Sequence, residues 1–252
     1  ESYAFIEKNP LLLKYEDITL YQHQKDIYNT FYYTIGNSDY NDPLANKFQA
    51  LSNNPGKLVL YTAPTGTGKT MTPLGLSEGY RIIFICAARH VGLAVAKSAV
   101  CMNKKIGIAF GCQTADDIRL HYYAASEYTR NTRTGGIGKV DNTVGDKVEI
   151  MICDIKSYLY AMYYMQAFND LDNVIMYWDE PTITMDYREH DHHDHIHEIW
   201  SKNKVPNVIL SSATLPKPDE IQDVIQDFRG KFENCRVESI VSHDCNKSIP
   251  LV

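Results

Sequence analysis

The chain has 252 residues, 44% hydrophobic and 11% aromatic, which is enough for a sizeable core in one large domain or two small ones. A formal net charge of −6 excludes a global basic field, so a nucleic-acid partner would need a local groove. With six scattered cysteines, no Cys-x-x-Cys pair, no signal-peptide pattern and no apolar run near the ~20 residues of a membrane span, we expect an intracellular protein without a membrane partner.

The first recognisable elements lead up to a glycine-rich turn. A helix is expected to start near Leu20, with Ile27 and Phe31 on its apolar side. The apolar run 58–62 predicts a buried strand, and a helix is expected from residue 70 to about 79. Between them stands Ala63-Pro-Thr-Gly-Thr-Gly-Lys-Thr70. Strand, glycine-rich turn and helix in this order are the context that a phosphate-binding loop requires.

The chemistry of this turn predicts ATP and Mg²⁺ as ligands. Gly66 and Gly68 allow backbone angles that point consecutive N–H groups at a phosphate, and the following helix adds the positive end of its dipole. Lys69 can reach the β- and γ-phosphates, and the hydroxyl of Thr70 can ligate Mg²⁺. The expected nucleotide-binding residues of the loop are Pro64, Thr65, Gly66, Thr67, Gly68, Lys69 and Thr70.

Beyond the loop, apolar runs alternate with amphipathic segments. Strands are expected at residues 81–87, 105–110, 148–153, 174–178, 208–211 and 235–241. This alternation predicts a parallel sheet covered by helices, in a single domain over residues 1–252. Residues 115–146 interrupt it, and we expect a helical first half and a mobile second half. The Gly-Lys pair within 133–140 lacks a preceding strand and is interpreted as a flexible loop.

Two later strand ends carry candidate catalytic side chains. The run 174–178 ends in Asp179 and Glu180, and ligands bind at the carboxyl ends of strands in open α/β sheets. Asp179 would hold Mg²⁺, and Glu180 would orient or activate the attacking water. The next strand ends in the hydroxyl residues Ser211, Ser212 and Thr214, which would lie beside Glu180. A serine-rich strand end before a proline turn is the plainer alternative.

Two further clusters are interpreted as structural. The run Glu189-His-Asp-His-His-Asp-His-Ile-His-Glu198 is rich in metal-ligand types, but a solvated helix start explains it more simply than a zinc site. The tyrosines and methionines of 158–168 recur at helical spacing. Packing against the sheet is therefore favoured over base stacking.

Three motifs together resemble the first motor domain of superfamily 2 helicases, the group that includes DEAD-box and DExH proteins. They are Ala-Pro-Thr-Gly-Thr-Gly-Lys-Thr, Asp-Glu-Pro-Thr and Ser-Ala-Thr-Leu-Pro, in this order and spacing. The resemblance implies a three-layer α/β RecA-like P-loop NTPase domain with a mainly parallel sheet. It also implies ATP-dependent unwinding, with RNA, slightly preferred, or DNA as partner. Asp-Glu-Pro-Thr departs from both Asp-Glu-Ala-Asp and Asp-Glu-x-His, which leaves the subfamily open.

The resemblance also implies roles for individual residues. Gln24, in Tyr21-Gln-His-Gln24, would read the adenine edge with its amide. Ser211 and Thr214 would couple hydrolysis to movement. Loops after three strands would contact the nucleic-acid backbone. The residues expected there are Arg89, His90, Gln113, Thr114, Lys156 and Ser157.

Motors of this group need a second RecA-like domain, which brings arginines to the γ-phosphate. No Gln-x-x-Gly-Arg-x-x-Arg-like stretch follows Thr214, so we expect that domain elsewhere in a longer parent chain and weak hydrolysis by this chain alone. An ATP-gated clamp or scaffold and a small-molecule kinase stay open as alternatives. Richness in Asn, Ile, Lys and Tyr fits an AT-rich source such as a large DNA virus, so the expected location is cytoplasm, nucleus, viral factory or virion.

Overall fold

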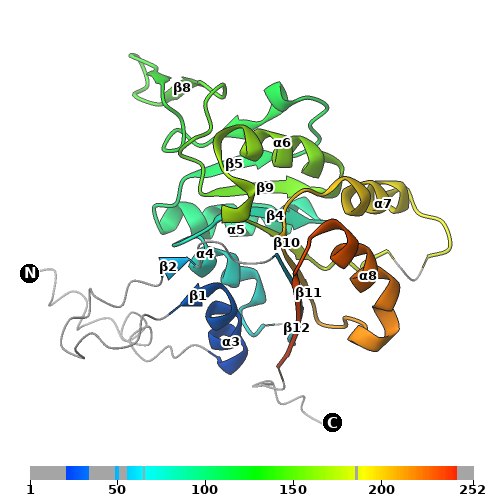
Figure 1. Cartoon of the computed structure of the whole chain (residues 1–252). Helices are drawn as coiled ribbons and strands as arrows, with labels where there is room; N and C mark the ends of the chain where they lie inside the picture. Colours follow the sequence, from blue (N-terminus) through cyan, green and yellow to red (C-terminus); the bar gives the residue numbers. More distant parts are fainter. Residues whose placement is uncertain (1–20, 34–48, 51–55, 65, 185–186, 243–252) are drawn as a thin grey trace, which may run out of the picture.

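The structure is a computed structural model that describes residues 21–33, 49–50, 56–64, 66–184 and 187–242. Its centre is an eight-stranded sheet of order β12-β3-β11-β10-β4-β9-β5-β6, in which only the β5–β6 pair is antiparallel (Figure 1). The strands are β3 (Lys57–Thr62), β4 (Arg81–Cys86), β5 (Ile106–Ala109), β6 (Arg119–Leu120), β9 (Ile150–Asp154), β10 (Val174–Asp179), β11 (Asn207–Ser212) and β12 (Arg236–Val241). Each strand predicted from the alternation is present, with ends shifted by a residue or two.

Helices cover both faces of this sheet. They are α3 (Gln22–Phe31), α4 (Thr72–Leu76), α5 (Arg89–Cys101), α6 (Tyr158–Phe168), α7 (His192–Lys202) and α8 (Gln222–Lys231). Side chains of α3, α4 and α5 pack in one hydrophobic core, and those of α6, α7 and α8 pack in a second core on the other face. Strands β9, β10 and β11 are buried along their whole length, as expected for a sheet covered on both sides. The predicted three-layer α/β architecture with a mainly parallel sheet is confirmed.

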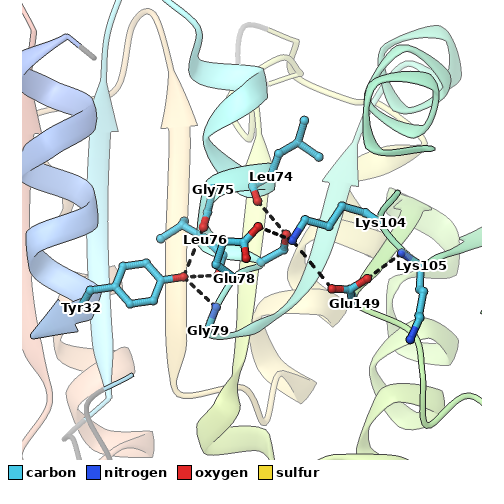
Figure 2. A network of polar contacts seen from close by, with 10 residues as sticks. Tyr32, Leu74, Gly75, Leu76, Glu78, Gly79, Lys104, Lys105 and Glu149 are labelled. Atoms are coloured by element: carbon cyan, nitrogen blue, oxygen red, sulfur yellow. Dashed lines mark hydrogen bonds and ion pairs between the residues drawn. The ribbon is translucent and has the colours of Figure 1, made fainter. Parts of the chain in front are cut away.

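The helix after the phosphate loop is shorter than expected. A 3₁₀ turn, η1 (Lys69–Met71), leads into α4, which ends at Leu76 instead of near Gly79. The hydroxyl of Tyr32, in the short strand β1 (Tyr32–Tyr33), donates to the Leu76 carbonyl at 2.5 Å and accepts from the Gly79 N–H at 3.0 Å (Figure 2). These bonds satisfy backbone groups at the helix end, so the chain turns there toward β4.

The prediction for residues 115–146 is wrong in its first half. These residues form a 3₁₀ turn, η2 (Ala115–Asp117), and then β6, which pairs with β5. Ile118 and Leu120 are buried, and their spacing of two residues is that of a strand. The second half forms a hairpin of β7 (Tyr128–Arg130) and β8 (Ile137–Val140), so 133–140 is only partly a loop. The hairpin projects beyond the β5 edge of the molecule (Figure 1).

The packing expected for residues 158–168 agrees with the fold. Tyr158, Met162 and Met165 of α6 are buried against the sheet. The histidine-rich run enters α7, and among the described residues no group of three or more His, Cys, Asp or Glu side chains is arranged to hold a metal ion. In the same part of the chain, no helix combines the length and apolarity needed to cross a membrane.

Candidate functional site

The loop at the carboxyl end of β3 has the backbone of an anion cradle. Gly66 and Gly68 adopt φ angles of 83° and 81°, in the left-handed region that disfavours every residue with a Cβ. The Thr67 hydroxyl donates to the Pro64 carbonyl at 2.7 Å and closes the turn. Thr65 lies outside the described residues. The two glycines are therefore required by the path of the chain, as the sequence pattern indicated.

Gln24 lies directly against this loop. Its Nε2 is 3.5 Å from the Gly68 carbonyl oxygen, and its Oε1 accepts from the Tyr21 N–H at 3.1 Å. A Cβ on Gly68 would come within 2.7 Å of Gln24 Nε2, which is a second reason for glycine at this position. The structure thus brings the first helix to the loop, and Gln24 would have to exchange backbone partners to contact a base.

One pocket joins the loop to the two acidic residues. It has a volume of about 400 Å³ and is lined by Gly66, Gly68, Lys69, Thr70, Asp179 and Glu180. The Lys69 ammonium lies 3.4 Å from Glu180 Oε1, and the lysine side chain is only 6% exposed. A buried cation needs a compensating anion, so this ion pair holds Lys69 in the pocket.

Asp179 is the most electrostatically perturbed carboxylate of the pocket. Burial, followed by repulsion from Glu180, raises the pKa of Asp179 to about 6, against the lowering effect of Lys69. Mg²⁺ in nucleotide sites is held by one or two carboxylates together with substrate phosphates. The pair Thr70 and Asp179 fits that kind of site, in which the ligand completes the coordination.

Glu180 is held in a fixed conformation at the end of β10. Its φ of 53° is left-handed, which is uncommon for a residue other than glycine, and its N–H donates to the Ser211 carbonyl at 2.7 Å. Its Oε2 accepts from the Ser212 hydroxyl at 2.5 Å, while Oε1 faces Lys69. Such strained backbone persists where neighbouring contacts fix it, and it is concentrated at functional sites.

The three hydroxyl residues after β11 have different surroundings. Ser211 is fully buried, and its Oγ lies 3.1 Å from the Tyr177 hydroxyl, which also donates to the Lys69 carbonyl at 2.8 Å. Ser212 contacts Glu180, and its Oγ also accepts from the N–H of the exposed Thr214 at 3.2 Å. Of the three hydroxyl side chains expected beside Glu180, it is therefore Ser212 that contacts it, whereas the coupling role had been expected of Ser211 and Thr214.

Asp154 connects three loops at the same edge of the sheet, although no motif in the sequence marks it. Its Oδ2 accepts from Arg89 Nη2 at 3.0 Å and from the Gly111 N–H at 2.9 Å. Its Oδ1 accepts from the Ser157 N–H at 3.0 Å. One carboxylate thus ties together the segments that follow β4, β5 and β9. Because these partners come from segments far apart in the chain, no residue spacing in the sequence marks Asp154.

The expected nucleic-acid contacts are not all on the surface. His90, Gln113, Thr114 and Lys156 are exposed, and Arg89 keeps 60% of its side chain exposed despite the ion pair. Ser157 is different, because it is fully buried and its hydroxyl accepts from the Cys112 N–H at 2.9 Å. The expectation that the Ser157 side chain contacts nucleic acid is therefore corrected. Ser157 supports the loop from below.

No family model matches the chain, and no curated protein does. Solved structures are similar in part. A hypothetical ATP-dependent RNA helicase from Sulfolobus tokodaii is 19% identical with a TM-score of 0.40, over 73% of this chain and 48% of that one. A DEAD-box protein from Methanococcus jannaschii is 16% identical with a TM-score of 0.44, over 73% and 45%. The DEAD-box helicase Mss116, bound to ssRNA and UDP-BeF, is 15% identical with a TM-score of 0.47, over 76% and 38%.

The chain spans about half, or less, of the length of these proteins. Identities of 15–19% do not establish an activity, which has to be inferred from the side chains of this chain.

Proposed function

We propose that this chain binds Mg-ATP at the phosphate loop and hydrolyses it as part of a nucleic-acid-dependent helicase or translocase. The main support is the single pocket in which the loop glycines, the buried Lys69, Asp179 and Glu180 converge at the carboxyl ends of parallel strands. Ligands bind at this edge in open α/β sheets. A second RecA-like domain in a longer parent protein would supply the arginines that stabilise the transition state.

The proposed roles follow from the position of each side chain. Bound Mg²⁺ would neutralise phosphate charge and orient the γ-phosphate. Lys69 would leave Glu180 for the phosphates, which compete for the same ammonium. Glu180, released from Lys69 and still bonded to Ser212, would accept a proton from the attacking water. Asp179 would bind the cation in its ionised form, above its raised pKa of about 6.

The proposed coupling of ATP hydrolysis to RNA or DNA binding rests on the loops at the carboxyl ends of the parallel strands. Because the strands are parallel, the loops after β4, β5 and β9 lie at the same edge as the phosphate loop. Asp154 ties these loops together, and Arg89 and Lys156 offer exposed cations beside it. The Ser212 hydroxyl is hydrogen-bonded to both Glu180 and the Thr214 backbone. Movement of Glu180 on nucleotide binding would therefore shift the segment after β11.

A second candidate is an ATP-gated clamp or scaffold that does not unwind nucleic acid. The ion pair between Lys69 and Glu180 favours it, because this pair engages the general base in the ligand-free protein. In that case ATP binding would change the conformation of the loops at the carboxyl ends of the strands, while hydrolysis would be slow and incidental.

Steady-state ATPase assays distinguish the two. Wild type, Glu180→Gln and the control Glu189→Gln, an exposed residue outside the pocket, are measured with single-stranded RNA, single-stranded DNA and no polymer. We expect stimulation by one polymer, a loss of at least tenfold in Glu180→Gln and no change in Glu189→Gln. Equal Glu180-dependent rates in all three conditions favour the clamp or scaffold. Turnover that does not depend on Glu180 overturns the proposal.

A further inference from the structure

The segment 115–146 carries an aromatic surface that the proposed ATPase does not use. Tyr122 packs against Tyr123 with ring centroids 4.5 Å apart and against Tyr128 at 5.4 Å. The guanidinium of Arg130 lies over the Tyr128 ring at 5.8 Å from its centroid. We call Tyr122, Tyr123, Tyr128 and Arg130 the tyrosine face. Its four planar groups are held together by their mutual contacts.

This surface is exposed. Tyr123 is 46% and Tyr128 38% exposed, and every residue of β7 is exposed. Strands β7 and β8 pair with each other in a separate two-stranded sheet. A two-stranded hairpin without a packed face is marginal by itself, and large aromatic side chains are usually buried. Exposed aromatics that form a patch mark a surface for binding a partner.

The charge of the hairpin indicates what kind of partner fits. Between Tyr128 and Val140 the chain carries three cations, Arg130, Arg133 and Lys139, and no carboxylate, although the whole chain has a net charge of −6. These cations favour an anionic partner, although Glu127 and Asp141 directly flank this stretch. Aromatic rings beside arginines provide stacking for bases and charge for phosphates, which is the combination used to bind single strands.

We propose that the tyrosine face, with Arg133 and Lys139, binds single-stranded nucleic acid. The inference rests on the proposed function and names a segment that holds the strand outside the main sheet. Strand β6 runs antiparallel to β5, and the His121 N–H donates to the Ile106 carbonyl at 3.0 Å, so Tyr122 and Tyr123 follow at the amino end of β5. A pocket of about 490 Å³ lies between Asp116 of η2 and the hairpin residues Tyr128, Thr129 and Lys139.

Carboxylates set the orientation of the bound strand. Asp116, Glu127 and Asp141 line the same pocket and repel phosphates from it. The phosphates are thereby directed to the cations of the hairpin, and the bases to the tyrosines. Hydrogen bonds from Thr143 hold the pKa of Asp141 below its usual value, so Asp141 remains ionised at neutral pH.

The tyrosine face is remote from the nucleotide pocket. Strands β3 and β5 are five positions apart in the sheet, which corresponds to ~24 Å at the usual spacing between strands. Substitutions in the hairpin should therefore leave nucleotide affinity unchanged. This separation allows the hairpin to be tested independently of ATP binding.

The test measures binding of a fluorescent single-stranded oligonucleotide by anisotropy, with RNA and DNA of the same sequence. The double variant Tyr123→Ala/Tyr128→Ala should bind about tenfold or more weakly, because stacking on an aromatic ring contributes a factor of this size per base. Tyr123→Phe/Tyr128→Phe keeps the rings and should bind as wild type does. The control Tyr160→Ala/Tyr163→Ala removes two exposed tyrosines from α6 and should have no effect.

The salt dependence tests the cations separately. Arg130→Ala/Arg133→Ala should reduce the slope of log Kd against log salt by about 1.4, since each phosphate contact to a single strand contributes about 0.7. Lys97→Ala, an exposed lysine of α5, serves as the charge control and should leave the slope unchanged. Unchanged thermal unfolding of each variant shows that the fold is intact.

The outcomes separate this inference from the proposed ATPase. Loss of oligonucleotide binding in the tyrosine variant, with unchanged binding of a fluorescent ATP analogue, supports the inference. If the wild-type protein does not bind the ATP analogue but the tyrosine substitutions still weaken oligonucleotide binding, the proposed ATPase fails and the inference stands. Absence of binding by wild type, equal binding by the alanine variant, or equal competition by poly-glutamate overturns it.

Discussion

The ion pair of Lys69 with Glu180 determines the electrostatic state of the pocket before a ligand binds. Their charged atoms are 3.4 Å apart, with Lys69 6% and Glu180 37% exposed. Burial, followed by repulsion from Glu180, raises the pKa of Asp179, and the nearby Lys69 ammonium offsets only part of this effect. The proposed Mg-nucleotide would bring a cation for Asp179 and anions for Lys69, and so would stabilise both charged side chains.

The raised pKa of Asp179 predicts a pH-dependent stability. The pKa of about 6 in the folded state lies above the ordinary value of 3.8, so the ionised carboxylate destabilises the folded protein above pH 6. This penalty disappears as the pH falls from 6 to 4 and the folded state takes up the proton. Asp179→Asn should therefore raise the free energy of unfolding at pH 7.5 by up to ~3 kcal/mol, with little gain at pH 4.

Urea denaturation in buffer with EDTA measures this difference at both pH values. The exposed Asp172→Asn is the matched control and should change stability little at either pH. A destabilised Asp179→Asn at pH 7.5 would show that the neighbours stabilise the ionised carboxylate, which contradicts a raised pKa.

The hydroxyl that positions Glu180 gives a second prediction at this scale. Ser212→Ala removes the 2.5 Å bond to Glu180 and leaves the carboxylate free to turn away from water. We expect the ATPase rate to fall about tenfold with nucleotide affinity kept, the size expected for a hydrogen bond to a charged group. Ser211→Ala is the control, because its hydroxyl contacts Tyr177 instead. A larger loss of rate in Ser211→Ala would assign the coupling to the residue that the sequence favoured.

The sequence identified Lys69, Asp179 and Glu180 as members of one site because local patterns mark them. It did not distinguish Ser211 from Ser212, since that choice depends on which face of β11 meets Glu180, and the left-handed backbone of Glu180 sets that contact. Asp154 was missed for a similar reason. Its partners Arg89 and Gly111 lie in the segments that follow β4 and β5, and only the folded sheet brings them together.

At the scale of elements, the end of α4 is defined by a side chain distant in sequence. Figure 2 shows the Tyr32 hydroxyl among the backbone groups of Gly75, Leu76 and Gly79, with Lys104 reaching Glu78 and Glu149 beside it. Tyr32→Phe removes these hydrogen bonds, while the N–H groups of Gly79 and Tyr80 still donate to the Leu76 carbonyl, and it should lower the free energy of unfolding by ~1 kcal/mol.

Chemical denaturation checks this value, with Tyr163→Phe on an exposed face of α6 as the control. Equal midpoints for the two variants would mean that water replaces the Tyr32 hydroxyl without cost. The termination of α4 would then need another cause, such as the glycines at 75 and 79.

The central strands were predictable because they are buried on both faces and therefore apolar throughout, as in β10. The strands of the segment 115–146 could not be predicted in this way. Strand β6 has two residues, and its pairing with β5 depends on a partner that is already in the sheet. The hairpin has no apolar face whose periodicity could be recognised, because nearly all of its residues are exposed.

At the scale of the molecule, the parallel sheet places its functional groups at one edge. Residues that follow β3 and the end of β10 line the proposed nucleotide pocket, and the carboxyl ends of β4, β9 and β5 carry the loops tied by Asp154. The sheet order then leads to the β7–β8 hairpin at the far end of the molecule (Figure 1). A net negative charge is compatible with nucleic-acid binding, because Arg89 and Lys156 form a local pair of exposed cations.

The affinity for Mg-ATP, measured by isothermal titration for wild type, Lys69→Ala and the exposed-lysine control Lys97→Ala, tests the central claim most directly. We predict binding by wild type and Lys97→Ala that requires Mg²⁺, and a loss of at least tenfold in Lys69→Ala, because Lys69 carries the one ammonium that lines the pocket among the residues that the structure describes. Equal affinity in Lys69→Ala, or no binding by a folded wild type, would contradict the assignment of this pocket to a nucleotide.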